Sequence, residues 1–331
     1  MKVIFLGPKG TYSHQAAIQE FGHFEDAELI PSSSIPECFD RLETDEDINY
    51  SVVPLENSTN GQVVFSYDLF RDRMLHAEKK TAGSSCSLPS IQVVGEQYVS
   101  IAHCLVSLLD ISLESLSNYE IVKLYSHPQV WGQVAEYLDA LQKKFPNVSF
   151  TRSDSSSTSD AVSTAIALQN NEPDQSKVLY LAISSEAAAS INNANPIDKK
   201  INDKKGNTTR FLVLKRSADA HAPSLIIPNE EDEISKHTRV SFITFTINDN
   251  PGALVNILSV LKDHSLNMCS IASRPFTTNE ISSRKWQYVF FVEFYNNSTN
   301  TDWDAFYREI DPQCLTWTLW GTFPRNERYY S

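Results

Sequence analysis

The sequence has 331 residues, a length typical of two or three domains rather than one. Its formal net charge is −13, because 41 Asp and Glu residues outnumber 28 Lys and Arg residues. A chain of this charge repels nucleic-acid phosphates and anionic membrane surfaces, so we expect it to bind neither. No apolar run approaches the ~20 residues that cross a bilayer, and the apolar N-terminal stretch is too short for a signal peptide. We therefore expect a cytoplasmic protein.

The five cysteines are scattered singly along the chain, with no CxxC pair. An odd number of isolated cysteines is typical of reduced thiols in a cytoplasmic protein, not of a disulfide framework or a zinc cage. The sequence also contains no HExxH, Walker or GxSxG motif. We therefore predict no metal site, no cofactor and no nucleophile of the usual hydrolase kind.

Up to about residue 216, short apolar runs typical of strands alternate with segments of helical periodicity. Strands are predicted at 2–6, 27–30, 50–53, 91–104, 121–124, 148–151, 178–183 and 210–215, and helices at 13–21, 128–143, 160–168 and 185–191. This alternation predicts α/β layers with a mainly parallel sheet, and chains of this size often form two lobes with a ligand cleft between them. Two polar stretches, 76–90 and 192–206, are predicted to be mobile insertions.

The pattern changes after residues 217–237, which contain two prolines and an acidic run and are predicted to be a linker. Strands are then expected at 239–247, 267–272, 286–295 and 315–320, with helices at 252–262 and 303–309. The order βαββαβ within 238–331 predicts a ferredoxin-like domain.

Several polar segments of the first part stand at helix starts or strand ends. Residues 7–13 (GPKGTYS) follow a strand and open a helix, where free N–H groups can bind an anion, although a capped turn without a ligand is equally compatible. Residues 56–58 (ENS) with Gly61 follow a buried strand, and residues 209–211 (TRF) open another. Arg210 suits bidentate carboxylate binding; the alternative for any single arginine is a surface salt bridge.

Two further polar segments precede helices. Residues 126–129 (SHPQ) head one helix, and Gln133 lies about two helical turns beyond Ser126. His127 could act as an acid or base, although a histidine at a helix start is more often a cap or packing residue. Ser157 and Thr158 belong to a serine-rich run before the next helix, where N-capping is the alternative role. Together, the hydroxyl and amide groups favour a site for a small polar anion.

In this order, the segments resemble the signature of the prephenate dehydratases: GPKGTYS at 7–13, ENS at 56–58, IAHCL at 101–105, SHPQ at 126–129, ST at 157–158, SSEAA at 184–188 and TRF at 209–211. The resemblance implies a two-lobed catalytic domain, like the periplasmic binding proteins, over 1–216, with the second lobe at roughly 92–180. It assigns proton donation to Thr209, with Glu56 as the alternative acid. Substrate contacts are implied for Thr11, Ser13, Asn57, Ser58, Ser126, His127, Gln133, Ser157, Thr158, Arg210 and Phe211.

The part over 238–331 resembles an ACT domain of the phenylalanine-binding kind, through 251–254 (PGAL) and 273–275 (SRP). The implied effector site comprises Asn250, Gly252, Ala253, Leu254, Ser273, Arg274 and Pro275. Ala272 stands where the family usually has Glu, so we expect weaker feedback by phenylalanine than is usual in the family. ACT domains commonly pair edge to edge, which implies a homodimer or a homotetramer.

The resemblance implies that the chain converts prephenate to phenylpyruvate, water and CO2 in phenylalanine biosynthesis. Two alternatives stay open at this point. An arogenate dehydratase performs the same chemistry on an amino-acid side chain. A two-lobed protein that only binds a small anion, fused to an amino-acid sensor, has no need for the TRF segment. No chorismate mutase segment is expected before the first strand.

Overall fold

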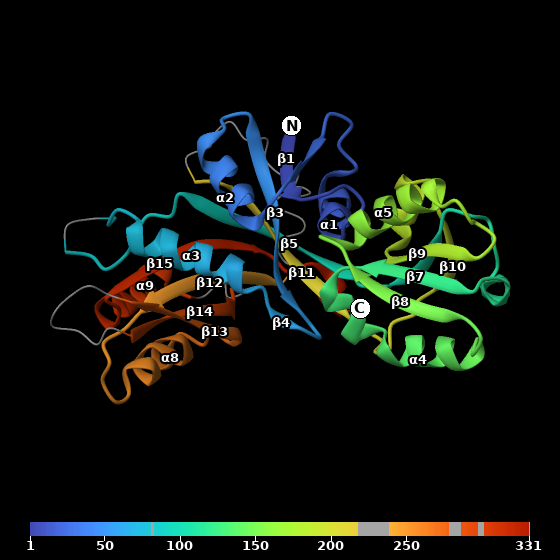
Figure 1. Cartoon of the computed structure of the whole chain (residues 1–331). Coiled ribbons are helices and arrows are strands. Elements are labelled where there is room, and N and C mark those ends of the chain that lie inside the picture. Colours follow the sequence, from blue (N-terminus) through green and yellow to red (C-terminus); the bar gives the residue numbers. More distant parts are fainter. Residues whose placement is uncertain (81–82, 218–237, 278–285, 297–300, 331) are drawn as a thin grey trace.

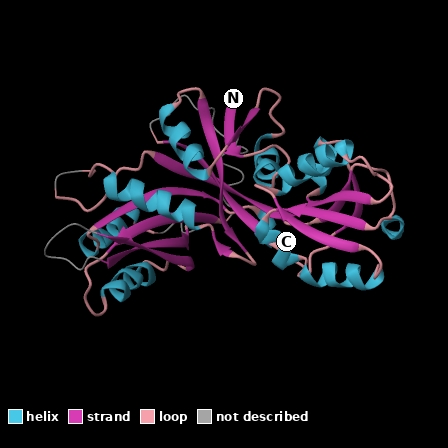
Figure 2. Ribbon diagram, viewed as in Figure 1, coloured by secondary structure: helices cyan, strands magenta, loops and turns pink. Residues whose placement is uncertain are grey.

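The structure is a computed structural model, and it describes residues 1–80, 83–217, 238–277, 286–296 and 301–330. Three β-sheets organise the described chain. In Figure 1 the first sheet lies in the middle, the second lies with the green segments at the right, and the third lies with the orange and red segments at the left. Figure 2 shows helices flanking each of the three sheets. The α/β architecture predicted from the sequence is confirmed, but the expected mainly parallel sheet is wrong, because the first and second sheets each mix parallel and antiparallel pairs.

The first sheet forms the first lobe and has the order β2-β1-β3-β11-β5, with β4 paired to β3. Its strands are β1 (Lys2–Leu6), β2 (Glu28–Ser32), β3 (Ile48–Asn57), β4 (Gly61–Gln62), β5 (Ile91–Ser100) and β11 (Thr208–Arg216). Its helices are α1 (Tyr12–Phe21), α2 (Ile35–Thr44) and α3 (Val64–His76). Strand β1 is parallel to β2 and β3, whereas β11 runs antiparallel to both of its neighbours. The last strand of this part of the chain therefore lies inside the first sheet, beside the ENS segment of β3.

The second sheet forms the second lobe and has the order β10-β6-β9-β7-β8. Its strands are β6 (Cys104–Ser107), β7 (Ile121–Ser126), β8 (Ser149–Asp154), β9 (Val178–Ser184) and β10 (Asn195–Lys199). Its helices are η1 (Leu113–Asn118), η2 (Pro128–Gln133), α4 (Ala135–Lys144), α5 (Thr158–Asn171) and α6 (Glu186–Ile191). Two short connections, 101–103 and 200–207, join the lobes. The second lobe thus spans 104–199 rather than the expected 92–180, because β5 pairs with β11 and β10 pairs with β6.

The third sheet is antiparallel, has the order β13-β14-β12-β15, and belongs to the C-terminal domain, residues 238–330. The elements follow as β12 (Arg239–Thr246), α8 (Ala253–Asp263), β13 (Met268–Thr277), β14 (Trp286–Tyr295), α9 (Trp303–Ile310), η3 (Asp311–Gln313), β15 (Thr316–Pro324) and η4 (Glu327–Tyr330). The βαββαβ order is the ferredoxin-like arrangement predicted from the sequence. The expected linker lies outside the described residues except for Ser217.

One face of the C-terminal sheet packs against the first lobe. On α3, Phe70 contacts Trp320 and Phe242 at ring-centroid distances of 4.8 and 5.4 Å, and these rings belong to one buried cluster. Strand β15 comes so close to β5 that a Cβ atom on Gly321 would lie 2.1 Å from the carbonyl oxygen of Val93. The first lobe and the C-terminal domain therefore share a continuous hydrophobic core.

Both stretches expected to be mobile insertions carry ordered structure. In the first, the backbone N–H of Ser85 and the hydroxyl of Ser84 donate to the Asp311 carboxylate at 3.1 and 3.0 Å, which fastens this segment to the C-terminal domain. The second contains β10, and Ile201 beyond it is buried in the core of the second lobe.

Among the described residues, no helix combines the length and the apolar character needed to cross a membrane.

Candidate functional site

Side chains alternate between the two faces of β11, which separates the residues of the TRF segment. Phe211 is buried in the core beneath α1, whereas Leu212 belongs to the core shared with α3 and the C-terminal sheet. By the twofold periodicity of a strand, Thr209 lies on the face of Phe211, and Arg210 lies on the face of Leu212. The side chains of Thr209 and Arg210 therefore point to opposite faces of the first sheet.

Thr209 is hydrogen-bonded to the ENS segment at the junction of the two lobes. The Asn57 side-chain amide donates to Thr209 Oγ1 at 2.9 Å and to Asn207 Oδ1 at 2.7 Å. In this bond Thr209 is the acceptor, which leaves its own hydroxyl proton to be donated. Two residues expected at the site, Asn57 and Thr209, are thus in direct contact.

The hydrogen bonds continue from Asn207 into the second lobe. Asn207 Nδ2 donates to Gln133 Oε1 at 2.9 Å, and His103 Nε2 lies 2.9 Å from the same oxygen. The hydroxyl of Tyr12 on α1 lies 3.1 Å from the other ring nitrogen, His103 Nδ1. We call Tyr12, Asn57, His103, Gln133, Asn207 and Thr209 the interlobe cluster. Asn57, Gln133 and Thr209 were predicted at the site from the sequence, whereas Tyr12, His103 and Asn207 were not.

His103 is a neutral imidazole in this setting. Its side chain is 1% exposed, and burial lowers its pKa, against the opposing hydrogen bond to Gln133. Because Gln133 Oε1 can only accept, the bond to it assigns the proton to Nε2 and leaves Nδ1 to accept from Tyr12. Burial also raises the pKa of Tyr12, so its hydroxyl keeps its proton. The cluster is therefore held together by uncharged groups with defined donors and acceptors.

The glycine loop before α1 contacts the second lobe directly. Ser159 Oγ on α5 donates to the carbonyl of Lys9 at 2.7 Å, and Ser185 Oγ donates to the carbonyl of Gly10 at 3.0 Å. Gly10 has φ +89°, and a Cβ atom there would lie 2.8 Å from Ser159 Oγ. This position therefore requires glycine both for its backbone conformation and for the close approach of the lobes.

Several predicted substrate contacts have structural partners instead. Thr11 accepts from the backbone N–H of His14 at 3.3 Å as the N-cap of α1, and Ser157 likewise accepts from that of Asp160 at 3.0 Å on α5. Ser126 is fully buried and donates to the carbonyl of Ile183 at 2.7 Å. Phe211, 1% exposed, is a core residue, so the expectation that Ser126 and Phe211 contact substrate is wrong in this arrangement.

The remaining predicted residues lie around the same junction. Ser58 Oγ donates to the carbonyl of Gly206 at 3.1 Å, and His127 Nδ1 accepts from the N–H of Gln129 at 3.3 Å. Burial lowers the pKa of His127, as it does for His103. Ser13 is buried on α1, and Thr158 is the first residue of α5. Ser13 and Thr158 thus lie at the starts of α1 and α5, whereas Ser58 follows β3 and His127 caps η2.

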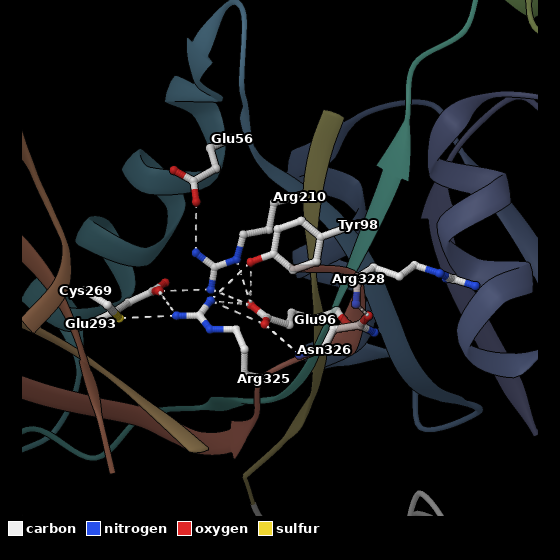
Figure 3. A network of polar contacts seen from close by, with 9 residues as sticks. All are labelled: Glu56, Glu96, Tyr98, Arg210, Cys269, Glu293, Arg325, Asn326 and Arg328. Carbon is white, nitrogen blue, oxygen red and sulfur yellow. Dashed lines mark hydrogen bonds and ion pairs between the residues drawn. The ribbon is translucent and has the colours of Figure 1, made fainter. Parts of the chain in front are cut away.

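On the opposite face of β11, Arg210 is surrounded by carboxylates (Figure 3). The Arg210 guanidinium donates to Glu56 Oε1 at 2.9 Å and to Glu96 Oε2 at 2.8 Å, and it lies 3.0 Å from Glu293 Oε2 as an ion pair without hydrogen-bond alignment. Its side chain is 4% exposed. Burial alone would lower the pKa of Arg210, but Glu293 and Glu96 raise it well above its ordinary value. In this structure the guanidinium of Arg210 is paired with protein carboxylates, and both its contact with a substrate carboxylate and the acid role of Glu56 stay predictions.

The predicted effector residues fall into two groups. Asn250, Gly252, Ala253 and Leu254 line a groove of about 640 Å³ in the C-terminal domain, together with Trp286 and Tyr288. Ser273, Arg274 and Pro275 do not line this groove. The Arg274 guanidinium instead donates to both oxygens of Asp68 on α3, at 2.8 and 3.2 Å. Ala272 is buried in the core shared with the first lobe.

Comparison with known proteins agrees with this architecture. A chain from Saccharomyces cerevisiae named as a probable prephenate dehydratase is 51% identical over 337 residues, covering 100% of this chain and 98% of the relative. The structure of prephenate dehydratase from Arthrobacter aurescens in complex with L-Phe aligns with a TM-score of 0.70 at 21% identity, over 98% of this chain and 90% of that chain. A quorum-quenching acylase, GqqA, also aligns with a TM-score of 0.70, at 18% identity, over 99% and 100% of the two chains. These two structures show a shared fold alone. A sequence model of the family described as prephenate dehydratase matches residues 3–219, and the chain belongs to the prephenate dehydratase family.

Proposed function

We propose that the chain acts as the lyase of this family through Thr209, which donates a proton to the departing hydroxyl group of prephenate. The observation that carries this proposal is the position of Thr209: its hydroxyl lies in the interlobe cluster, accepts from Asn57 and keeps its own proton for donation. The substrate is a dianion whose ring becomes aromatic on losing CO2 and hydroxide, so the driving force lies in the substrate. The protein must bind it, orient it and assist the leaving group.

The reaction needs a donor because hydroxide is a poor leaving group. As the ring carboxylate leaves as CO2, its bonding electrons enter the ring and the C–O bond breaks; the proton from Thr209 completes a water molecule, and solvent then returns a proton to Thr209. A positioned proton donor typically contributes ~10²–10⁴-fold to the rate. Glu56 is less suited to this role, since its carboxylate is paired with Arg210 on the other face of the sheet.

We assign substrate orientation to the amides of Asn57 and Gln133 and to the polar side chains of Ser13, Ser58, His127 and Thr158. Uncharged ligands suit the carboxylate that leaves as CO2, because a strong cation would hold it in its charged form.

Substitution of Thr209 tests the proposal. Thr209→Ala should lower kcat by about 10²-fold or more with little change in KM, as expected for an interaction formed mainly in the transition state. Thr209→Ser restores a hydroxyl and should keep much of the activity. Initial rates of phenylpyruvate formation give both constants, and a near-normal kcat for Thr209→Ala would remove Thr209 from the chemistry.

We further propose that L-phenylalanine is the effector and that it binds in the groove lined by Gly252 and Leu254. The groove offers the apolar surfaces of Leu254 and Trp286 beside the polar loop that ends at Asn250. Ser273 and Arg274 lie outside it, so a second copy of the chain, in a homodimer or homotetramer, would have to supply them. Calorimetric titration with L-phenylalanine tests this site; no heat of binding would limit the C-terminal domain to assembly.

We place the enzyme in the cytoplasm.

A further inference from the structure

We propose that Arg210 is a positioning residue, which fixes the site end of β11 to the C-terminal domain through Glu293. The proposal rests on the function proposed for Thr209. We call Glu96, Arg210, Glu293 and Arg325, with Glu56 at the rim, the charged cluster (Figure 3).

Two adjacent pairs of residues connect the site to the charged cluster. Asn57 and Thr209 are hydrogen-bonded on the face of the interlobe cluster, at 2.9 Å. Their chain neighbours, Glu56 and Arg210, form an ion pair at 2.9 Å on the opposite face. A displacement of the Arg210 guanidinium therefore acts on the backbone that carries the Thr209 hydroxyl.

The C-terminal domain supplies the other half of the charged cluster. Glu293 lies within β14, and Arg325 directly follows β15. Arg325 Nη1 donates to Glu96 Oε2 at 3.1 Å, and the backbone N–H of Asn326 donates to Glu96 Oε1 at 2.9 Å. The two sheets are thus joined by charged contacts from both sides of their boundary.

Because the four side chains are buried, breaking the contacts between them is unfavourable. Glu96 and Arg325 are 0% and 2% exposed, and Arg210 and Glu293 are each 4% exposed. Burial raises the pKa of Glu293, so its charged form depends on Arg210 and then on Arg325. If the C-terminal sheet moved away alone, it would leave buried charges without partners, at a high free-energy cost. The C-terminal sheet and the end of β11 are therefore expected to move together.

Through this linkage, the C-terminal domain can change the position of the Thr209 hydroxyl. Any event that changes how the C-terminal sheet lies on the first lobe would shift Arg210 and, through β11, the Thr209 hydroxyl. The linkage also accounts for the arginine of the TRF segment, because Arg210 would position Thr209 without contacting the substrate.

Two variants, one on each side of the boundary, test the linkage. Arg210→Lys keeps the charge but cannot bridge three carboxylates, and Glu293→Gln keeps the shape without the charge. Each should lower kcat by about tenfold while KM changes less than about twofold, since Thr209 acts mainly in the transition state. If one variant folds poorly, the other still gives the result.

Asp311→Asn is the matched control. Asp311 is also a carboxylate of the C-terminal domain that accepts hydrogen bonds from the first part of the chain, at Ser84 and Ser85, but it does not contact the charged cluster. Its kinetic constants should stay at wild-type values. A rise in KM with unchanged kcat in Arg210→Lys would assign Arg210 to the substrate, and an equal loss of kcat in Asp311→Asn would reveal general loosening of the domains; either result overturns the proposal.

Hydrogen exchange separates this proposal from the proposed function. Backbone amides near Thr209 in β11 should exchange faster in Glu293→Gln than in Asp311→Asn, whether or not the protein turns over prephenate. An inactive wild type with this exchange pattern would remove the proposed function and keep the linkage. Unchanged exchange in Glu293→Gln would remove the linkage.

Discussion

At the residue scale, His103 illustrates how uncharged groups hold the two lobes together. Its imidazole lies between Tyr12 on α1 and Gln133 at the end of η2, so one ring contacts both lobes. A protonated ring would place a charge in a buried site, which is why burial lowers its pKa. The contact is therefore sensitive to pH.

This sensitivity predicts the pH dependence of stability. In the unfolded chain His103 has a pKa of about 6.5, and in the folded protein its pKa is lower. Between the two values the unfolded state binds more protons, so the free energy of unfolding falls as the pH falls below about 6.5. His103→Gln should weaken this dependence by about 1.4 kcal/mol for each pKa unit of the shift. Urea unfolding at several pH values measures it; identical slopes for wild type and variant would contradict the assignment.

Three residues of the interlobe cluster, Asn57, Gln133 and Thr209, could be predicted through the family resemblance of the segments in or near which they stand. The alternation of a strand places Thr209 and Arg210 on opposite faces, but only the buried neighbours of β11 show which face meets the interlobe cluster. A signal for the charged cluster was present: Glu96 and Glu293 interrupt strands that are otherwise mainly apolar. A charge in such a strand indicates a buried partner, but the partner is distant in the sequence.

At the scale of the elements, the start of α1 brings the two lobes into contact. The carbonyls of Lys9 and Gly10 accept hydrogen bonds from Ser159 and Ser185 in the second lobe, and Gly10 leaves room for this approach. The loop at Lys9 and Gly10 therefore holds the first lobe close to the second lobe.

Gly10→Ala tests this contact. The left-handed backbone costs about 1–2 kcal/mol for an alanine, and its Cβ would also crowd Ser159. We expect kcat/KM to fall by about tenfold or more. Gly83→Ala is the matched control, because Gly83 has a similar φ of +86° and nothing within 4 Å of an added Cβ. Equal kinetics for the two variants would show that the close approach is unimportant.

Most strands and helices could be predicted because their periodicity is strong. Strand β10 could not: Asn195–Lys199 is short, polar and at the edge of its sheet, where pairing to β6 decides its conformation. Strand β5 was correctly expected as extended but was placed in the wrong lobe. Its partner β11 comes more than a hundred residues later, and the sequence does not specify such pairing.

At the scale of the whole molecule, the C-terminal domain is packed onto the catalytic part. Phe70 on α3 is fully buried between Phe242 and Trp320, and the charged cluster lies at the same boundary. The sequence could predict the ferredoxin-like domain but not this contact. In the structure, β12 is buried on both faces, which requires cover on both sides of the C-terminal sheet.

A shared core predicts cooperative unfolding of the first lobe and the C-terminal domain. Phe70→Ala should lower the free energy of unfolding by about 3–5 kcal/mol, since it removes a buried ring that packs against residues on both sides of the boundary. Phe65→Ala on the same helix removes a side chain that is 67% exposed and should change stability by less than about 0.5 kcal/mol. Fluorescence and calorimetry should report one shifted transition; an independent, unshifted transition of the C-terminal domain would contradict a shared core.

The most direct test of the account is a comparison of prephenate and arogenate as substrates for the wild-type protein. Initial rates with each substrate, and the amounts of keto-acid or amino-acid product and CO2, decide between the two dehydratases and a protein that only binds. We predict turnover of prephenate to equimolar phenylpyruvate and CO2, with kcat in the usual enzymatic range of about 1–10³ s⁻¹ and kcat/KM at least tenfold above that for arogenate. Preference for arogenate, or binding of prephenate without product, would contradict the account.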